Sequence, residues 1–169
     1  MKKLLLIAVL AFLPGFLFAE TIMLYTRMQP AETGNGKNID RFIAVEDGVE
    51  DQFYTSGHII FDAGVPKPNF AEASLTQGDA WAQKVAISGG ARFLLLVNLT
   101  FPDAPKPAVV PDSISYRFAD LKTGKTLAEG TLRVTLTKEQ MAGKRPYDLC
   151  FALGQEIARD AMSNWQPNS

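Results

Sequence analysis

The chain has 169 residues, 47% of them hydrophobic and 21% charged, and a formal net charge of −1 at neutral pH. This length and composition suit one folded domain with a hydrophobic core, and mixed charges without a basic stripe do not favour a nucleic-acid partner. Cys150 is the only cysteine and His58 the only histidine. This excludes an intramolecular disulfide and leaves too few ligands for a zinc site, so we expect no metal and no cofactor.

Residues 1–19 have the features of a secretory signal peptide. A basic start, Met1-Lys2-Lys3, precedes an apolar core that is too short to span a bilayer comfortably, and the segment ends on a small residue. We expect cleavage after Ala19, which would release a single domain of residues 20–169, periplasmic or secreted, without stable membrane insertion. The alternative is a leader retained as an N-terminal anchor, because Leu17 stands where a small residue is preferred.

The beginning of the mature chain has the pattern of strand, helix and strand. An apolar, β-branched stretch predicts a strand over residues 21–27. Apolar residues then recur at three- and four-residue spacing, which predicts an amphipathic helix from Asn38 that ends at Ser56-Gly57. A short strand is predicted over 58–61. The predicted buried face of the helix consists of Ile39, Phe42, Ile43, Val49 and Phe53.

The next segments predict a second helix and the central strand. Thr76-Gln77-Gly78-Asp79 has the form of a capping box, so we expect a helix from there to about Ser88, ended by Gly89-Gly90. Residues 92–101 form the most uniformly apolar part of the mature chain. A strand without polar alternation is covered on both faces, which places this one at the centre of the sheet.

The remaining elements are a hairpin and a last helix. Clean alternation predicts a half-buried strand over 113–119, turn residues follow at 120–125, and a second alternating strand is predicted over 131–136. Residues 137–140 indicate one helical turn, and the last helix is predicted from Tyr147 to about Asn164. Its apolar seam is Leu149, Cys150, Leu153, Ile157 and Ala161.

This order of elements predicts an α/β (α+β) fold: a single domain with a mixed sheet of about five strands and three main helices. The order, together with three phrases, resembles a group of bacterial envelope domains. The phrases are Ser56-Gly57-His58-Ile59-Ile60, Gly90-Ala91-Arg92-Phe93-Leu94-Leu95, and Phe118-Ala119-Asp120-Leu121-Lys122-Thr123-Gly124-Lys125. The group comprises the amino-terminal domain of the TolB translocation protein, curli-secretion-type lipoproteins, and outer-membrane activators of penicillin-binding proteins.

The resemblance covers nearly the whole mature chain and implies a TolB-amino-terminal-like domain that is not an enzyme. Domains of this group bind other proteins or assemble into envelope machinery, so envelope proteins are the implied partners. The chain departs from the lipoprotein members because it lacks the lipid-attachment cysteine. No functional residue carries over, since the matching positions are structural.

Chemistry-bearing residues are few. His58 is the candidate general base, and strand alternation would place Asp62 on the same face. The alternative to an interaction module is therefore a small-molecule or peptide binder, or a hydrolase, with a site formed by these two residues and the loop 64–69. Cys150 lies in the apolar seam of the last helix and is interpreted as a buried small hydrophobe. We therefore predict no catalytic, cofactor-binding or metal-binding residue. The leading hypothesis is an exported, non-enzymatic protein that binds partners through a face of the sheet or through the loop 102–111.

The two tryptophans are predicted to pack in the interior. Trp81 lies on the second helix between alanines, which favours a core position. Trp165 follows the last helix, and we expect it to pack back on the domain. The alternative is an exposed aromatic anchor for a partner.

Overall fold

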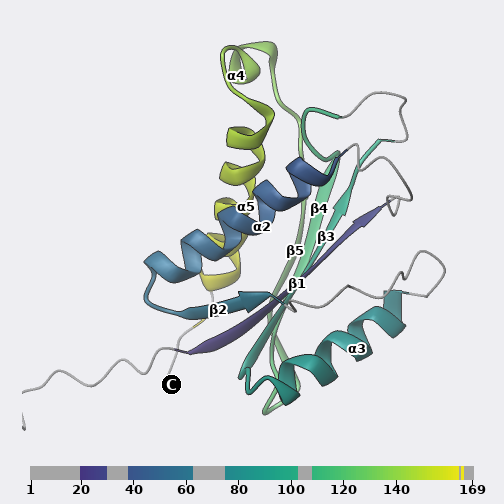
Figure 1. The fold of residues 1–169 in the computed structure, drawn as a ribbon, viewed down its shortest axis with the longest axis vertical. Coiled ribbons are helices and arrows are strands. Elements are labelled where there is room, and N and C mark those ends of the chain that lie inside the picture. The colour runs from purple at the N-terminus through teal and green to yellow at the C-terminus, as the bar shows by residue number, and fades with distance from the viewer. Residues whose placement is uncertain (1–19, 30–37, 63–74, 103–107, 164, 166–169) are drawn as a thin grey trace, which may run out of the picture.

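The computed structural model describes residues 20–29, 38–62, 75–102, 108–163 and 165. They form one mixed sheet with strand order β2-β1-β3-β4-β5, with helices on both of its faces (Figure 1). The elements are β1 (Thr21–Gln29), α2 (Ile39–Thr55), β2 (Ile59–Asp62), α3 (Leu75–Ser88), β3 (Phe93–Thr100), β4 (Ser113–Asp120), β5 (Lys125–Arg133), α4 (Lys138–Met141) and α5 (Pro146–Ser163). The predicted fold class is confirmed, and β3 holds the central position that its apolar sequence predicts.

The helices cover the two faces unequally. Strand β1 pairs in parallel with β2 and with β3, whereas β3, β4 and β5 pair antiparallel. The chain crosses from β1 to β2 through α2 and then back over β1 to β3 through α3. Because crossovers between parallel strands are right-handed, two crossovers in opposite directions place their helices on opposite faces. Helices α2 and α3 therefore lie on opposite faces. Helix α5 packs beside α2, so that in the described ranges α3 is alone on its face (Figure 1).

The hydrophobic core has two parts, one on each face. The larger part lies under α2 and α5 and includes Phe93, Leu95 and Phe118, whereas the smaller part lies under α3 and includes Leu94 and Leu96. Successive residues of β3 thus alternate between two buried layers, each of which removes large side chains from water. At about 1.5 to 3 kcal/mol for each buried large side chain, this strand contributes strongly to folding.

Helices α2 and α5 approach each other closely at two glycines. A Cβ atom on Gly48 would lie 2.0 Å from the carbonyl oxygen of Phe151, and one on Gly154 would lie 2.2 Å from that of Val45. Neither distance leaves room for a methyl group. The predicted seam of the last helix is confirmed, since Leu149, Cys150, Leu153, Ile157 and Ala161 are all buried.

Three details of the prediction are wrong. Ile39 and Ile43 are exposed by 41% and 43%, because the buried stripe of α2 turns toward α5 and is centred on Val45 and Val49. Helix α3 begins at Leu75, so Thr76 lies inside the helix and the carboxylate of Asp79 contacts arginines in place of a cap.

The third correction concerns the hairpin. Strand β5 begins at Lys125, directly after the turn, and not near residue 131. Gly124 adopts a φ of 70°, and the carboxylate of Asp120 accepts the backbone N–H of Lys122 and of Thr123, which makes the connection tight. A register shift between Phe118 and Ala119 breaks the alternation of the first half of β5, so the sequence pattern shows only the second half.

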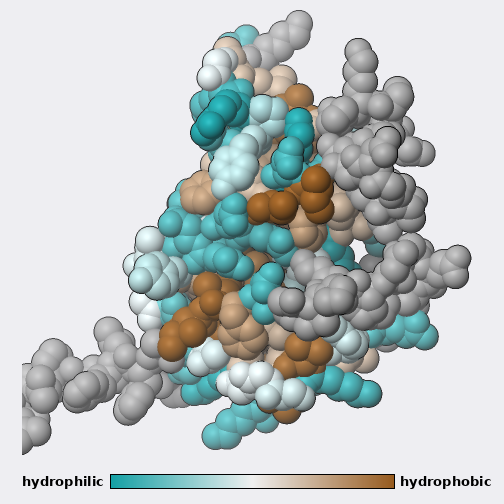
Figure 2. Space-filling view, viewed as in Figure 1, coloured by the Kyte–Doolittle hydropathy of each residue, from teal (hydrophilic) through white to brown (hydrophobic). Residues whose placement is uncertain are grey.

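The surface carries no broad apolar area in the view of Figure 2, where apolar residues form separate patches between hydrophilic ones. No helix in the described ranges is long and apolar enough to cross a membrane.

Candidate functional site

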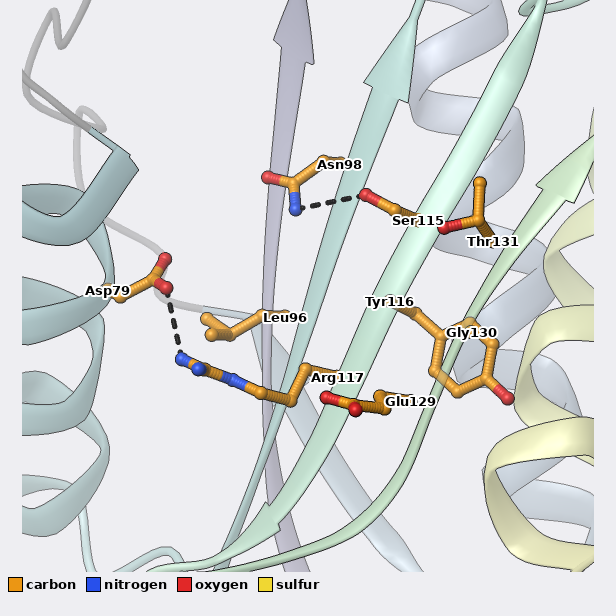
Figure 3. Close-up of a pocket in the computed structure, with 9 residues that line it drawn as sticks. All are labelled: Asp79, Leu96, Asn98, Ser115, Tyr116, Arg117, Glu129, Gly130 and Thr131. Carbon is orange, nitrogen blue, oxygen red and sulfur yellow. Dashed lines mark hydrogen bonds and ion pairs between the residues drawn. The ribbon is translucent and has the colours of Figure 1, made fainter.

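Among the described residues, a helix covers only half of the α3 side of the sheet. Helix α3 packs on β1 and β3, and the outer strands β4 and β5 extend beyond it (Figure 1). A hollow of about 510 Å³ lies over these strands (Figure 3). Its lining residues are Asp79, Leu96, Asn98, Ser115, Tyr116, Arg117, Glu129, Gly130 and Thr131. We call the surface formed by Asp79, Asn98, Ser115, Arg117, Glu129 and Thr131 the polar face.

Strand alternation creates this surface. Ile114, Tyr116 and Phe118 of β4 project toward α2 and α5, so Ser115 and Arg117 between them project toward the α3 side. Ser115 pairs with Thr131 and Arg117 with Glu129 across β4 and β5. Side chains from three neighbouring strands therefore form a row, Asn98, Ser115 and Thr131, which is seen in Figure 3.

An ion-pair network joins the polar face to α3. The carboxylate of Asp79 lies 2.8 Å from a guanidinium nitrogen of Arg27 and 3.0 Å from one of Arg117. Arg27 also donates from Nε to Oδ1 of Asn98 at 2.6 Å, and Asn98 donates to the hydroxyl of Ser115 at 3.4 Å. These contacts connect residues up to 71 positions apart. They hold the charged and amide groups in fixed positions before any partner arrives.

The polar face presents hydroxyl, amide, carboxylate and guanidinium groups that can hydrogen-bond to a ligand. Its hydroxyl groups, on Ser115 and Thr131, have no imidazole or thiolate beside them. Across the described residues, no three His, Cys, Asp or Glu side chains are grouped so as to hold a metal ion. The carboxylate of Asp79 is shared by Arg27 and Arg117, whereas the carboxylate of Glu129 has no ion-pair partner among the described residues.

His58 lies away from this surface, in an aromatic cluster on the α2 and α5 side. Its ring is 4.5 Å from that of Trp165 and 6.2 Å from that of Phe53. Burial lowers the pKa of His58, against a smaller opposing effect of the Glu20 carboxylate. Nδ1 of His58 has no hydrogen-bond partner among the described residues.

The alternative site would also include Asp62 and the loop 64–69. Asp62 is the exposed last residue of β2, and residues 64–69 lie outside the described part of the chain. Neither His58 nor Asp62 lines the hollow over β4 and β5. Of the loop 102–111, residues 103–107 also lie outside the described part, and the N–H of Ala108 donates to Oδ1 of Asn38 at the start of α2.

Two further predictions are confirmed. Cys150 is buried, its thiol lies 3.7 Å from the carbonyl oxygen of Val109, and burial raises its pKa to about 11, so it is neither ionised nor accessible at neutral pH. Trp165 packs back on the domain, with its ring 4.9 Å from that of Phe93 and 5.2 Å from that of Phe118.

Sequence reasoning named a sheet face as the binding surface but did not find the residues that form it. The signal that points to Ser115, Arg117 and Thr131 is the same alternation that predicts the strands, since polar residues opposite a buried face must share the other face. Asp79 carried no such signal, because its partners lie on strands that are distant in the sequence.

Comparison with known proteins finds likenesses in structure only. No known protein family and no curated protein matches the sequence. A PelC dodecamer subunit from Paraburkholderia phytofirmans is similar at a TM-score of 0.47 and 10% identity, over 85% of this chain and 88% of PelC. TolB from Acinetobacter baumannii is similar at a TM-score of 0.45 and 15% sequence identity, over 86% of this chain and 27% of TolB.

The lipoprotein GNA1162 from Neisseria meningitidis is similar at a TM-score of 0.46 and 16% identity, over 83% of this chain and 99% of the lipoprotein. TolB, which the order of elements and the three sequence phrases resemble, is thus among the similar structures. At these identities and TM-scores the likenesses assign neither a function nor a partner to this chain.

Proposed function

We propose that the chain is an exported, non-enzymatic protein-interaction module of the bacterial envelope, which binds partner proteins through the polar face. The signal-peptide pattern of residues 1–19 supports the export, and residues 20–169 would be the mature domain. The observation that carries the proposal is the half of the α3 side of the sheet over which no described helix lies. There, side chains of both charges and several hydrogen-bonding groups are held outward on a rigid support.

Recognition by this surface would rest on fixed polar groups. The network around Asp79 positions Arg117, whose side chain is 46% exposed, and Glu129 lies beside it on the next strand. Charges arranged in this way select a partner with the complementary pattern and reject like charges. Because the strands and the network already hold these groups, little side-chain entropy is lost when a partner binds.

The hydrolase alternative lacks support from the surroundings of its candidate base. A general base needs a reacting group within hydrogen-bonding distance and a pKa near the operating pH. The ring of His58 instead packs between Trp165 and Phe53, and burial lowers its pKa. Aromatic contacts of this kind are typical of a packed histidine.

Photo-crosslinking in the producing cell tests the binding surface. A photoreactive amino acid would replace Thr131 or Ser115 in the full chain, and as a control Tyr54, which is 76% exposed on α2 on the other side of the sheet. We expect discrete higher-mass adducts from the two polar-face positions, none from Tyr54, and loss of the adducts when Arg117→Glu is added. The absence of adducts from the polar face, or the same adducts from Tyr54, would disprove this assignment.

Export is tested separately at the amino terminus. Mass spectrometry of the protein released from the envelope should find Glu20 as the first residue. Recovery in the membrane fraction with Met1 or residue 2 still in place would instead establish the anchored alternative.

A further inference from the structure

Strand β5 is an edge strand with a long free side. In the described part of the chain, β4 is its one strand neighbour, so its outer edge has no strand beside it. It is nine residues long, whereas β2 at the opposite edge of the sheet has four. A long edge strand presents unpaired backbone N–H and C=O groups to which another strand can bind.

The hydrogen-bonding pattern between β4 and β5 identifies the β5 residues whose backbone groups face outward. The N–H of Val134 donates to the carbonyl oxygen of Asp112 on the β4 side at 2.9 Å. Residues of an antiparallel pair alternate between bonding to the partner and facing away. The register therefore directs the backbone groups of Gly130 and Leu132 toward β4, and those of Glu129 and Thr131 outward.

A hollow flanks this edge on each face of the sheet. The hollow on the α3 side is lined by Glu129, Gly130 and Thr131 of β5. A second hollow, of about 470 Å³, lies between β5 and α5 and is lined by Thr131 and Leu132 of the same strand. Because successive side chains of a strand point to opposite faces, a strand added at this edge would direct its side chains alternately into the two hollows.

Tyr116 lines the second hollow, and the pairing of β4 with β5 fixes its position. Tyr116 lies opposite Gly130, and a Cβ atom there would lie 2.8 Å from the Tyr116 ring. The ring thus extends across β5 toward α5 (Figure 3), and its hydroxyl donates a hydrogen bond to the carboxylate of Asp160. The side chain is fixed at both ends, so the hollow exists before any ligand binds.

The middle of the edge favours a basic side chain of a ligand, whereas Lys125 and Arg133 lie at the two ends of β5. Among the described lining residues, each hollow has two carboxylates and one guanidinium. Glu129 lines the hollow on the α3 side and Glu156 the one beside α5, and in the described ranges neither carboxylate has a hydrogen-bond or ion-pair partner. An incoming strand with Lys or Arg side chains would therefore find an unpaired carboxylate on either face of the sheet.

A second copy of the chain is a poorer match for this edge. Antiparallel pairing of two full β5 strands would be centred on Glu129. This would place Glu129 opposite its counterpart and Lys125 opposite Arg133 of the other copy. Like charges directly opposite each other destabilise a strand pair. The pattern thus disfavours full-length self-pairing.

We propose that the free edge of β5 binds an extended, basic segment of a partner protein as a sixth strand, with Glu129 and Glu156 pairing with its Lys or Arg side chains. The proposal rests on the proposed function and specifies the partner chemistry. Main-chain hydrogen bonds to Glu129 and Thr131 would supply affinity, and the two hollows would select the side chains.

The test measures binding of short labelled peptides to the full chain by fluorescence polarisation. One peptide repeats Lys-Lys-Val-Val, which places lysines on both faces of an extended strand. A second repeats Glu-Glu-Val-Val, and a third is the lysine peptide with alternate backbone nitrogens methylated. We expect the unmethylated lysine peptide to bind and the other two to bind at least about tenfold more weakly. Equal binding of the methylated peptide or of the glutamate peptide refutes the inference, and so does absence of binding.

Matched variants separate backbone pairing from side-chain contacts. Thr131→Pro removes an outward N–H without removing a bond to β4, so the fold is expected to persist, whereas Thr131→Val keeps that N–H. Thr131→Pro should weaken binding at least about tenfold and Thr131→Val much less, and Glu129→Gln with Glu156→Gln should weaken it about tenfold. If Thr131→Pro does not fold, the methylated peptide still decides the question.

The outcomes distinguish the two proposals. A dimer of the wild-type chain that Thr131→Pro converts to a monomer would show that a second copy occupies the edge, which overturns the inference. Adducts from position 131 in the cell without binding of the lysine peptide would leave the interaction module in place and overturn only the strand addition.

Discussion

The contact between α2 and α5 leads to a prediction about two glycines. Gly→Ala inside a helix ordinarily stabilises a protein by about 1 kcal/mol, because alanine loses less backbone entropy. Here the added methyl group on Gly48 would meet the carbonyl oxygen of Phe151 at 2.0 Å, and one on Gly154 would meet that of Val45 at 2.2 Å. Backbone atoms cannot rotate away, so the helices must separate by roughly 1 Å, which opens gaps along a tightly packed interface.

The magnitude follows from these two opposing effects. Overpacking costs about 1 to 3 kcal/mol, and a clash with backbone belongs at the upper end of that range. Subtracting the gain in helix propensity leaves Gly48→Ala and Gly154→Ala each about 2 kcal/mol less stable than the wild type. Once one methyl group has separated the helices, the second finds part of its space already open, so the double variant should be destabilised by less than the sum.

Urea unfolding followed by circular dichroism measures these differences. Tyr54→Ala, at a position of α2 that is 76% exposed, is the control for helix propensity and should change stability by less than about 0.5 kcal/mol. If Gly48→Ala is as stable as the wild type or more so, the close approach of the helices is wrong. Strict additivity in the double variant would refute the shared-contact argument.

Three further outcomes follow from single side chains. The thiol of Cys150 is buried with a pKa raised to about 11, so a thiol reagent at pH 8 should label the native chain far more slowly than the urea-unfolded chain. The pKa of His58 is lowered from 6.5 in the folded chain, so the unfolded chain binds a proton at this imidazole more readily. The free energy of unfolding should therefore fall as the pH drops below about 6.5, and His58→Gln should make that fall shallower. Asp79→Asn should destabilise the chain by about 1 kcal/mol, because Arg27 and Arg117 lose their shared carboxylate, and added salt should affect the variant less than the wild type.

For each of these three predictions, one result would contradict the reasoning. Rapid labelling of native Cys150 would mean that the seam of α5 is open to solvent. An unchanged acid limb in His58→Gln would mean that other groups determine stability in that range. Asp79→Asn with wild-type stability would mean that α3 is held by its apolar contacts alone.

Local patterns predict the elements because each pattern is a property of neighbouring residues. The uniformly apolar residues 92–101 predicted a strand buried on both faces, and β3 lies at the centre of the sheet between two buried layers. The seam of the last helix was predicted for the same reason. The predicted start of the second hairpin strand was wrong because the register shift at Phe118 and Ala119 interrupts the alternation of buried and exposed residues in β5.

What the sequence by itself determined is therefore the order of strands and helices and the buried residues of β3, β4 and α5, because hydrophobic periodicity acts over a few residues. Only the tertiary structure decided that Asp79 joins Arg27 and Arg117, that α3 does not extend over β4 and β5, and that β5 is the last strand of the sheet in the described part of the chain. These features depend on which distant segments become neighbours. Strand order and helix placement set that proximity, and no local propensity encodes it.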